Sequence, residues 1–342
     1  MPFPNNHIAW TDNGLVLLDQ RLLPHTIEFV TLTTAPAVAD AIRDMVVRGA
    51  PAIGVAAAYG VVLAVRRHLR GAGDDWRPAV DAELDHLAQA RPTAVNLQWA
   101  VDHMRSVIAS TPAAALVERL TAEAIRIHDD DIAANKAMGE FGAQLLPQAA
   151  HVITHCNAGA LATGGHGTAL GVIRSAHGAG KIGMVYSCET RPWFQGARLT
   201  MYELIADEIP ATQIVDSAAA ALMQSRRIDW VITGADRIAR NGDVANKIGT
   251  YALAVAARAH GVKFMVAAPR STFDQALATG ADIAIEQRGE DEITTVAGHR
   301  IAATGGRVWN PVFDVTPAHL IDAIVCETGV ILDPGKHGAA IP

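Results

Sequence analysis

The feature that most constrains the fold is a change in hydrophobic periodicity near Pro147. Before it, residues 35–144 show apolar residues at helical spacing and favour Ala, Leu, Glu and Arg. After it, short apolar runs of strand length alternate with helical segments, which predicts a parallel sheet covered on both faces. We therefore expect an α/β protein, with a small N-terminal strand and helical domain (1–145) followed by a Rossmann-like α/β domain (146–342).

The same patterns predict individual elements. Residues 7–34 alternate like short strands, and Asp12-Asn-Gly14 has the composition of a hairpin turn. The expected strands in this part are 7–10, 14–18 and 26–30, and the expected helices are 37–47, 51–69, 76–90, 95–110 and 113–145. Beyond Pro147 the expected strands are 151–154, 182–186, 213–215, 230–233, 263–267 and 323–325.

Composition excludes several classes of protein. The 342 residues carry a formal net charge of −7 without a basic stripe, which argues against nucleic-acid binding. Three cysteines suggest no disulfide framework and fit the reducing cytoplasm, and the N-terminus lacks a signal-peptide pattern. The apolar run 49–65 is just short of a membrane span and rich in Ala and Gly, so we expect a buried helix and no membrane association.

One segment concentrates polar chemistry: Thr233-Gly-Ala-Asp-Arg-Ile-Ala-Arg-Asn-Gly-Asp-Val-Ala-Asn-Lys-Ile-Gly249. It follows a short buried strand, and we expect a helix to begin at Lys247. Open α/β sheets place ligands at the carboxyl ends of their parallel strands. Asp236 is therefore a candidate proton donor or base, and Lys247 with free amides at a helix start is a candidate anion site.

Two breaks between helices carry an arginine. In Arg48-Gly-Ala-Pro-Ala-Ile-Gly54, Pro51 suits a first helical turn, and Arg48 beside free amides suits a phosphate. Taken alone, the same residues are explained more simply by a helix elbow with a surface arginine, because such elbows are common. Arg91-Pro-Thr-Ala-Val-Asn-Leu97 is a weaker sign, because Pro92 alone explains it as a helix stop.

A cysteine stands at the end of the first parallel strand, in Thr154-His-Cys-Asn157. A thiol near helix-end amides can act as a thiolate, although a lone cysteine at a strand end is more often inert packing. Further along, Gly164-Gly-His-Gly167 is similar to a dinucleotide-binding loop, with Glu189 in the place of its ribose-binding acid. The irregular stretch between Cys156 and Gly164 departs from that fingerprint, which turns directly from strand to helix.

The segment after the second parallel strand is Glu189-Thr-Arg-Pro-Trp-Phe-Gln-Gly-Ala-Arg-Leu-Thr200. Gln195 precedes a helix and is a candidate for binding sugar hydroxyls. Arg191 has two open uses, since its guanidinium can bind a ligand or tie loops together through Glu189 or Asp216.

Together these segments resemble the methylthioribose-1-phosphate isomerase family. The matching motifs run in the family's order over roughly residues 40 to 320, nearly the whole chain. They are Arg48-Gly-Ala-Pro-Ala-Ile-Gly54, Arg91-Pro-Thr-Ala-Val-Asn-Leu97, Thr154-His-Cys-Asn157, Glu189-Thr-Arg-Pro192 with Gln195-Gly-Ala-Arg-Leu-Thr200, Gly234-Ala-Asp-Arg237 with Asn241-Gly-Asp-Val-Ala-Asn-Lys-Ile-Gly-Thr250, and Asn310-Pro with Phe313-Asp-Val-Thr-Pro317. Ala158, Ala160 and Trp193-Phe194 depart from the family pattern without removing a reacting group.

The resemblance implies an aldose–ketose isomerase of methionine salvage, which converts 5-methylthioribose 1-phosphate to 5-methylthioribulose 1-phosphate without a metal or cofactor. It implies that Asp236 is the proton donor, that Cys156 acts at C1 and C2, and that the protein is a homodimer. It also implies a set of substrate-binding residues, with Gln195 on the hydroxyls: Arg48, Gly49, Ala50, Arg91, Gln195, Asn246 and Lys247.

Alternatives from other classes stay open. The family also includes a ribose-1,5-bisphosphate isomerase and regulatory subunits of the exchange factor for eukaryotic initiation factor two, which resemble the same fold without the catalytic Cys and Asp. Both Cys156 and Asp236 are present here, which favours an enzyme. The alternative substrates are 5-deoxyribose 1-phosphate and ribose 1,5-bisphosphate, and the Gly164–Gly167 segment leaves a dinucleotide-dependent dehydrogenase open.

Overall fold

The structure is a computed structural model that describes residues 7–69, 76–91 and 95–339. Contacts divide the chain into two compact units. The N-terminal unit contains the described residues up to Asn135 together with Gly159–Gly167, and the C-terminal unit contains Lys136–Ala158 and the described residues from Thr168 onward. The division falls within helix α5 (Leu116–Gln144), whereas the expected domain boundary at residue 145 coincides with the end of that helix.

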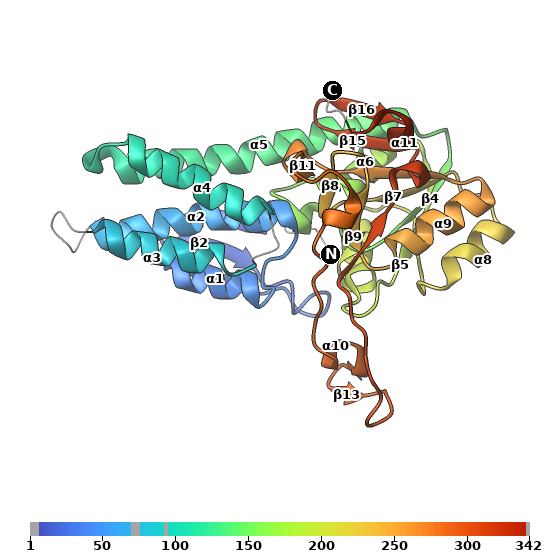
Figure 1. Ribbon diagram of the computed structural model, residues 1–342, viewed down its shortest axis with the longest axis horizontal. Coiled ribbons are helices and arrows are strands. Elements are labelled where there is room, and N and C mark those ends of the chain that lie inside the picture. Colours follow the sequence, from blue (N-terminus) through green and yellow to red (C-terminus); the bar gives the residue numbers. More distant parts are fainter. Residues whose placement is uncertain (1–6, 70–75, 92–94, 340–342) are drawn as a thin grey trace. The chain divides into compact units, whose positions relative to one another are not determined.

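The N-terminal unit joins a three-stranded antiparallel sheet to a group of helices (Figure 1). Its strands are β1 (Ile8–Thr11), β2 (Gly14–Leu18) and β3 (Phe29–Leu32). Thr11 pairs with Gly14, which confirms the predicted hairpin turn. Besides the first part of α5, its helices are α1 (Ala35–Arg43), α2 (Ala50–Leu69), α3 (Arg77–Ala88) and α4 (Val95–Ser110).

Helix α2 lies in the core of this unit. Every residue from Ala52 to Val65 is buried, because the sequence is apolar around the whole helix circumference. By length and composition α2 could cross a membrane, but 78% of its most apolar window is buried inside the protein. The predicted buried helix is therefore confirmed, and its apolar character is accounted for by the core.

The C-terminal unit is built on a seven-stranded sheet in the order β16-β15-β10-β7-β4-β5-β6. All neighbours from β15 to β6 are parallel, and only β16 runs antiparallel to its partner. The six strands predicted after Pro147 all lie in this sheet. Its strands are β4 (Ala150–Thr154), β5 (Ile182–Cys188), β6 (Ala211–Ile214), β7 (Trp230–Thr233), β10 (Lys263–Ala267), β15 (Ala323–Cys326) and β16 (Gly329–Leu332).

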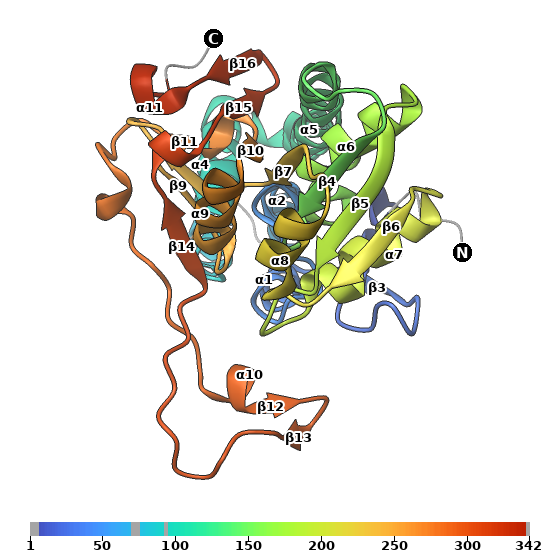
Figure 2. The same ribbon diagram turned by 90° about the vertical axis from the view of Figure 1, so that its right-hand side faces the viewer.

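Helices cover both faces of this sheet (Figure 2). Alternate residues of β10 show why: Phe264 and Val266 face a core shared with α8 (Ala218–Ser225) and α9 (Thr250–His260), and Met265 faces the opposite core. The opposite core is shared with the end of α5, with α6 (Ala169–Gly178) and with α7 (Met201–Ala206). Burial on both faces explains why these strands are continuously apolar.

A second, smaller sheet departs from the prediction. Its order is β11-β8-β9-β14, with β8 (Arg237–Ala239), β9 (Val244–Lys247), β11 (Phe273–Asp274) and β14 (Phe313–Thr316). Lys247 is thus the last residue of a strand, and the prediction that it begins a helix is wrong. Antiparallel pairing with β14 keeps residues 244–247 extended, and Gly249, with φ +104°, redirects the chain into α9.

The C-terminal unit also carries an extended arm, which projects from the body of that unit in Figure 2. It contains the short helix α10 (Asp291–Thr294) and the two-residue strands β12 (Thr295–Val296) and β13 (His299–Arg300). The arm returns through Asn310, whose side-chain amide donates to Gly289 O at 3.0 Å and to Glu292 Oε2 at 3.1 Å. These contacts hold the two ends of the arm together.

Candidate active site

The strand order reverses at the centre of the large sheet. The chain moves outward from β4 through β5 to β6, then returns to place β7 on the other side of β4 and continues outward. In open α/β sheets such a reversal leaves a ligand crevice at the carboxyl ends of the two central strands. Cys156 follows β4, and Asp236 follows β7, so both candidate catalytic residues stand at this reversal.

The loop after β4 and the loop after β7 approach each other closely, which explains the glycine at position 234. A Cβ on Gly234 would lie 2.8 Å from the Cβ of Ala158, in the loop after β4. A larger residue at position 234 would force the loops apart. The fold therefore brings the loops that carry Cys156 and Asp236 into contact at one edge of the sheet.

The backbone of Cys156 is held in an unusual conformation. Its φ of +63° lies in the left-handed region, where residues other than glycine are uncommon. Its N–H donates to Thr190 Oγ1 at 2.9 Å, and its carbonyl accepts from Thr200 Oγ1 at 2.6 Å. These two hydrogen bonds hold the half-buried thiol in one place at the end of the sheet.

Thr190 is in turn positioned by Asp216. The two oxygens of the Asp216 carboxylate accept the N–H groups of Thr190 and Arg191, both at 2.7 Å. The guanidinium of Arg191 instead donates to Pro192 O at 3.1 Å and to Ile293 O at 2.9 Å. Arg191 therefore ties loops together, as one of its two predicted uses requires. Its side chain contacts Ile293 in the arm, and Asp216 binds its backbone and not its guanidinium.

The two aspartates after β7 differ in what they bind. Asp243 accepts hydrogen bonds from Asn241 Nδ2 at 2.8 Å, Gly280 N at 3.0 Å and Ala318 N at 2.9 Å. It therefore organises the surrounding loops. Asp236 donates its N–H to Ala245 O at 2.9 Å and lies half-buried between β7 and β8.

Lys247 is a buried cation close to both candidate catalytic residues. Only 6% of it is exposed, and burial lowers the pKa of its ammonium. Cys156, Asp236 and Glu292 of α10 oppose that shift electrostatically. Its Nζ also lies 5.3 Å from the centre of the Phe313 ring on β14. A buried ammonium in this position favours a thiolate at Cys156.

Asn246 and Gln195 are buried polar residues of the same unit. Asn246 Nδ2 donates to Thr250 Oγ1 at 3.0 Å, which anchors the first turn of α9. Gln195 is 7% exposed. It directly precedes a short π-helical turn, Gly196–Thr200, in agreement with its predicted position before a helix. Its Oε1 has no hydrogen-bond partner among the described residues, so an acceptor is left for a ligand hydroxyl.

The other predicted binding residues belong to the N-terminal unit. Arg48 and Gly49 directly precede α2, and Ala50 is its first residue, so the predicted helix start is confirmed. Gly49 has φ +98°, and a Cβ there would lie 2.6 Å from the Cα of Ala162. Arg91 follows α3, and the next residues of its motif, 92–94, lie outside the described residues.

The Gly164–Gly167 segment, the candidate dinucleotide loop, lacks the free backbone amides that bind a pyrophosphate. Gly164 donates its N–H to Asp131 Oδ2 at 2.6 Å, and its carbonyl lies 2.9 Å from His128 Nε2. The Asp131 carboxylate thus accepts the hydrogen bond that this amide would donate to a pyrophosphate. The segment belongs to the N-terminal unit, whereas the helix that follows, α6, belongs to the C-terminal unit.

The roles of Thr190, Glu292 and Asp216 were not predicted from the sequence. Thr190 was only part of a motif, and its hydroxyl contact with Cys156 depends on the pairing of β4 with β5. Glu292 lies in the arm, for which the sequence predicted no helix or strand. Its electrostatic effect on Lys247 was therefore not expected. For Asp216 the sequence did contain a signal. It directly follows the predicted strand 213–215, and this position indicates the same sheet edge as Cys156.

The effect of Lys247 on the thiol can be tested by alkylation. In Lys247→Met we expect the pH of half-maximal Cys156 alkylation to rise by about 1–3 units, because the thiolate loses a nearby positive charge. Iodoacetamide labelling followed by peptide mass spectrometry measures this for Cys156 alone. Lys263→Met, which removes an exposed ammonium, should leave the profile unchanged. Equal profiles for the wild type and Lys247→Met would show that the ammonium has no influence on Cys156.

Comparisons with known proteins agree with this architecture. The Initiation factor 2 subunit family matches residues 46–333. The methylthioribose-1-phosphate isomerase of Thioalkalivibrio sulfidiphilus is 58% identical over 96% of this chain and 94% of its own. The corresponding protein of Alkalilimnicola ehrlichii is 57% identical over 97% and 95%.

Two solved structures are similar over nearly the whole chain. The 5-methylthioribose 1-phosphate isomerase of Pyrococcus horikoshii has a TM-score of 0.92 and 40% identity, covering 98% of this chain and 94% of its own. The delta subunit of translation initiation factor eIF-2B from A. fulgidus has a TM-score of 0.87 and 42% identity, covering 97% of both chains. The resemblance drawn from the motifs is confirmed: the chain belongs to the Initiation factor 2 subunit family, together with methylthioribose-1-phosphate isomerases.

Proposed function

We propose that this protein is an isomerase that converts 5-methylthioribose 1-phosphate to 5-methylthioribulose 1-phosphate. The observation that carries the proposal is the meeting of the Cys156 and Asp236 loops at the strand-order reversal, where Gly234 packs against Ala158. The names and the 57–58% identity of the bacterial relatives supply the substrate. The cytoplasmic location and the homodimer implied by the resemblance stay predictions.

The substrate explains why an acid and a second group are needed. Its anomeric carbon carries phosphate, so the sugar ring cannot open to a free aldehyde. In the proposed scheme Asp236 protonates the ring oxygen as the bond from C1 to that oxygen breaks. Hydrogen then moves from C2 to C1 beside Cys156, and the C2 hydroxyl loses a proton as the ketone forms. That proton balances the one donated by Asp236, so the reaction is a net isomerisation.

Binding residues would supply positioning. We propose that Arg48, the amides of Gly49 and Ala50, Arg91, Asn246 and Lys247 hold the substrate and its phosphate, since cations and helix-start amides favour anions. Gln195, with its unpartnered Oε1, would accept a hydrogen bond from a sugar hydroxyl. Fixing the phosphate also fixes C1 against the two reacting groups.

A regulatory role is the second candidate. The similarity to a structure named as an eIF-2B subunit, at 42% identity, is its support. A sensor of this class would bind a sugar phosphate or nucleotide without converting it. Retention of Cys156, Asp236 and the buried Lys247 favours the enzyme, because a sensor has no need of a matched acid and thiol.

The proposed reaction can be assayed directly. We expect purified protein to convert 5-methylthioribose 1-phosphate to the ketose without an added cofactor. Parallel reactions with 5-deoxyribose 1-phosphate and ribose 1,5-bisphosphate measure selectivity at C5, where one thioether is worth about 1–3 kcal/mol in an apolar pocket. Binding without turnover of any of the three would instead support the regulatory candidate.

Removing either reacting group should abolish most of the turnover while the protein stays folded. Cys156→Ser and Asp236→Asn are each expected to lower kcat by at least ~10²-fold, the usual contribution of an acid–base group. Cys326→Ala and Asp333→Asn, which change a thiol in β15 and a surface carboxylate, are matched controls and should keep normal kcat. Near-normal kcat in either test variant would remove that residue from the scheme.

The hydrogen bond from Cys156 N–H to Thr190 Oγ1 predicts a positioning role for the threonine. Thr190→Val removes the hydroxyl but keeps the branched shape, and we expect kcat to fall about tenfold with little change in KM. Thr190→Ser retains the hydroxyl and should restore most of the rate. If valine and serine variants behave alike, the hydroxyl does not position Cys156 for the reaction.

A further inference from the structure

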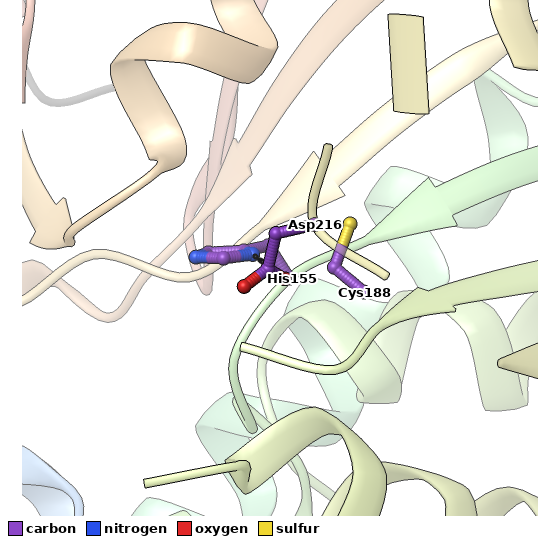
Figure 3. Close-up of side chains that lie close together, drawn as sticks. All are labelled: His155, Cys188 and Asp216. Carbon is purple, nitrogen blue, oxygen red and sulfur yellow. Dashed lines mark ion pairs between the residues drawn. The ribbon is translucent and has the colours of Figure 1, made fainter. Parts of the chain in front are cut away.

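Three side chains of the kinds that commonly bind metals lie together beside the proposed active site, at the ends of neighbouring strands. They are His155 after β4, Cys188 at the end of β5 and Asp216 after β6 (Figure 3). One ligand atom from each lies within 4.8 Å of the others. His155 is 2% exposed and Cys188 is fully buried, so the cluster is not a solvated surface group.

The hydrogen bonding of His155 leaves its second nitrogen available. Nε2 lies 2.8 Å from Ile248 O, and because a carbonyl can only accept, Nε2 carries the proton. Nδ1 therefore has a lone pair, and it has no hydrogen-bond partner among the described residues. Gly249 leaves room for the ring, since a Cβ there would lie 3.0 Å from its Cε1 and Nε2 atoms.

This lone pair points toward other electron-rich groups. The nearest Asp216 oxygen is 3.9 Å from Nδ1, and Cys188 completes the cluster. A cation would satisfy all three groups together.

We propose that His155 Nδ1, Cys188 Sγ and one oxygen of Asp216 bind a divalent cation of the zinc class, with water as the fourth ligand. Nitrogen, thiolate sulfur and carboxylate oxygen are the usual protein ligands of zinc, and three of them plus water form a tetrahedral site. The N–H of His155 on Ile248 O matches the hydrogen bond that commonly orients a metal-binding histidine.

Geometry and charge are compatible with this assignment. Ligand atoms around tetrahedral zinc lie about 3.3–3.6 Å apart, so the cluster needs only a modest contraction. A cavity of about 300 Å³ adjoins the three side chains and gives room for the water. Binding replaces the Cys188 proton, which is released, and the thiolate and the Asp216 carboxylate together neutralise the dication.

Asp216 can serve the cation and the active-site loop together. Its two oxygens already accept the amides of Thr190 and Arg191, and each carboxylate oxygen has a second lone pair. An occupied site would join the ends of β4, β5 and β6 through their side chains. The proposal goes beyond the isomerase function and does not depend on it, and the proposed reaction routes no step through this cation.

Cobalt(II) is the probe that tests the site, because its thiolate complexes absorb in the near ultraviolet and its tetrahedral complexes absorb strongly in the visible. We expect the full-length protein to bind one Co²⁺ with both absorptions, to release one proton and to lose the bands when Zn²⁺ is added. Cys188→Ala and Cys188→Ser should remove the thiolate band, and Cys326→Ala and Cys156→Ser should keep it. Circular dichroism confirms that each variant is folded.

Two results would overturn the proposal. One is the absence of a thiolate-to-cobalt band in the wild-type protein. The other is a band that survives in both Cys188 variants, because the thiolate would then come from Cys156 or Cys326. Neither result bears on isomerase turnover, which is measured separately, so failure of this site and failure of the proposed function are distinguishable.

Discussion

The parallel pairing of β4 with β7 is the constraint on which the rest of the C-terminal unit depends. Since β5 and β6 lie on one side of this pair and β10 and β15 on the other, the chain leaves the two strand ends in opposite directions. The space above them stays free of crossing connections, and side chains that follow either strand face a common region. Cys156, Asp236 and the loops that hold them are placed by that topology.

Burial of Lys247 adds an electrostatic constraint to the topological one. Burial lowers the pKa of the Lys247 ammonium, an effect that Cys156, Asp236 and Glu292 oppose and Arg288 reinforces. The same interaction links the strand ends to α10 at the base of the arm. Residues from three separate parts of the chain thus act on one buried cation.

The fold by itself does not distinguish an enzyme from a regulatory protein. Structures named as an isomerase and as an eIF-2B subunit both match nearly the whole chain, with TM-scores of 0.92 and 0.87. Function therefore has to be argued from side chains. The unpartnered Gln195 Oε1 and the left-handed backbone at Cys156 and Thr190 are local departures from relaxed structure, of the kind that accompanies ligand sites.

The sequence by itself determined the α/β class, the break near Pro147, the six parallel strands and the strand-end positions of Cys156 and Asp236, because these follow from local periodicity. The tertiary structure decided what depends on distant partners. Residues 244–247 became a strand because β14, far along the chain, pairs with them, and Lys247 became buried for the same reason. Asp216 holds Thr190 because β5 and β6 are neighbours, a contact that no local pattern contains.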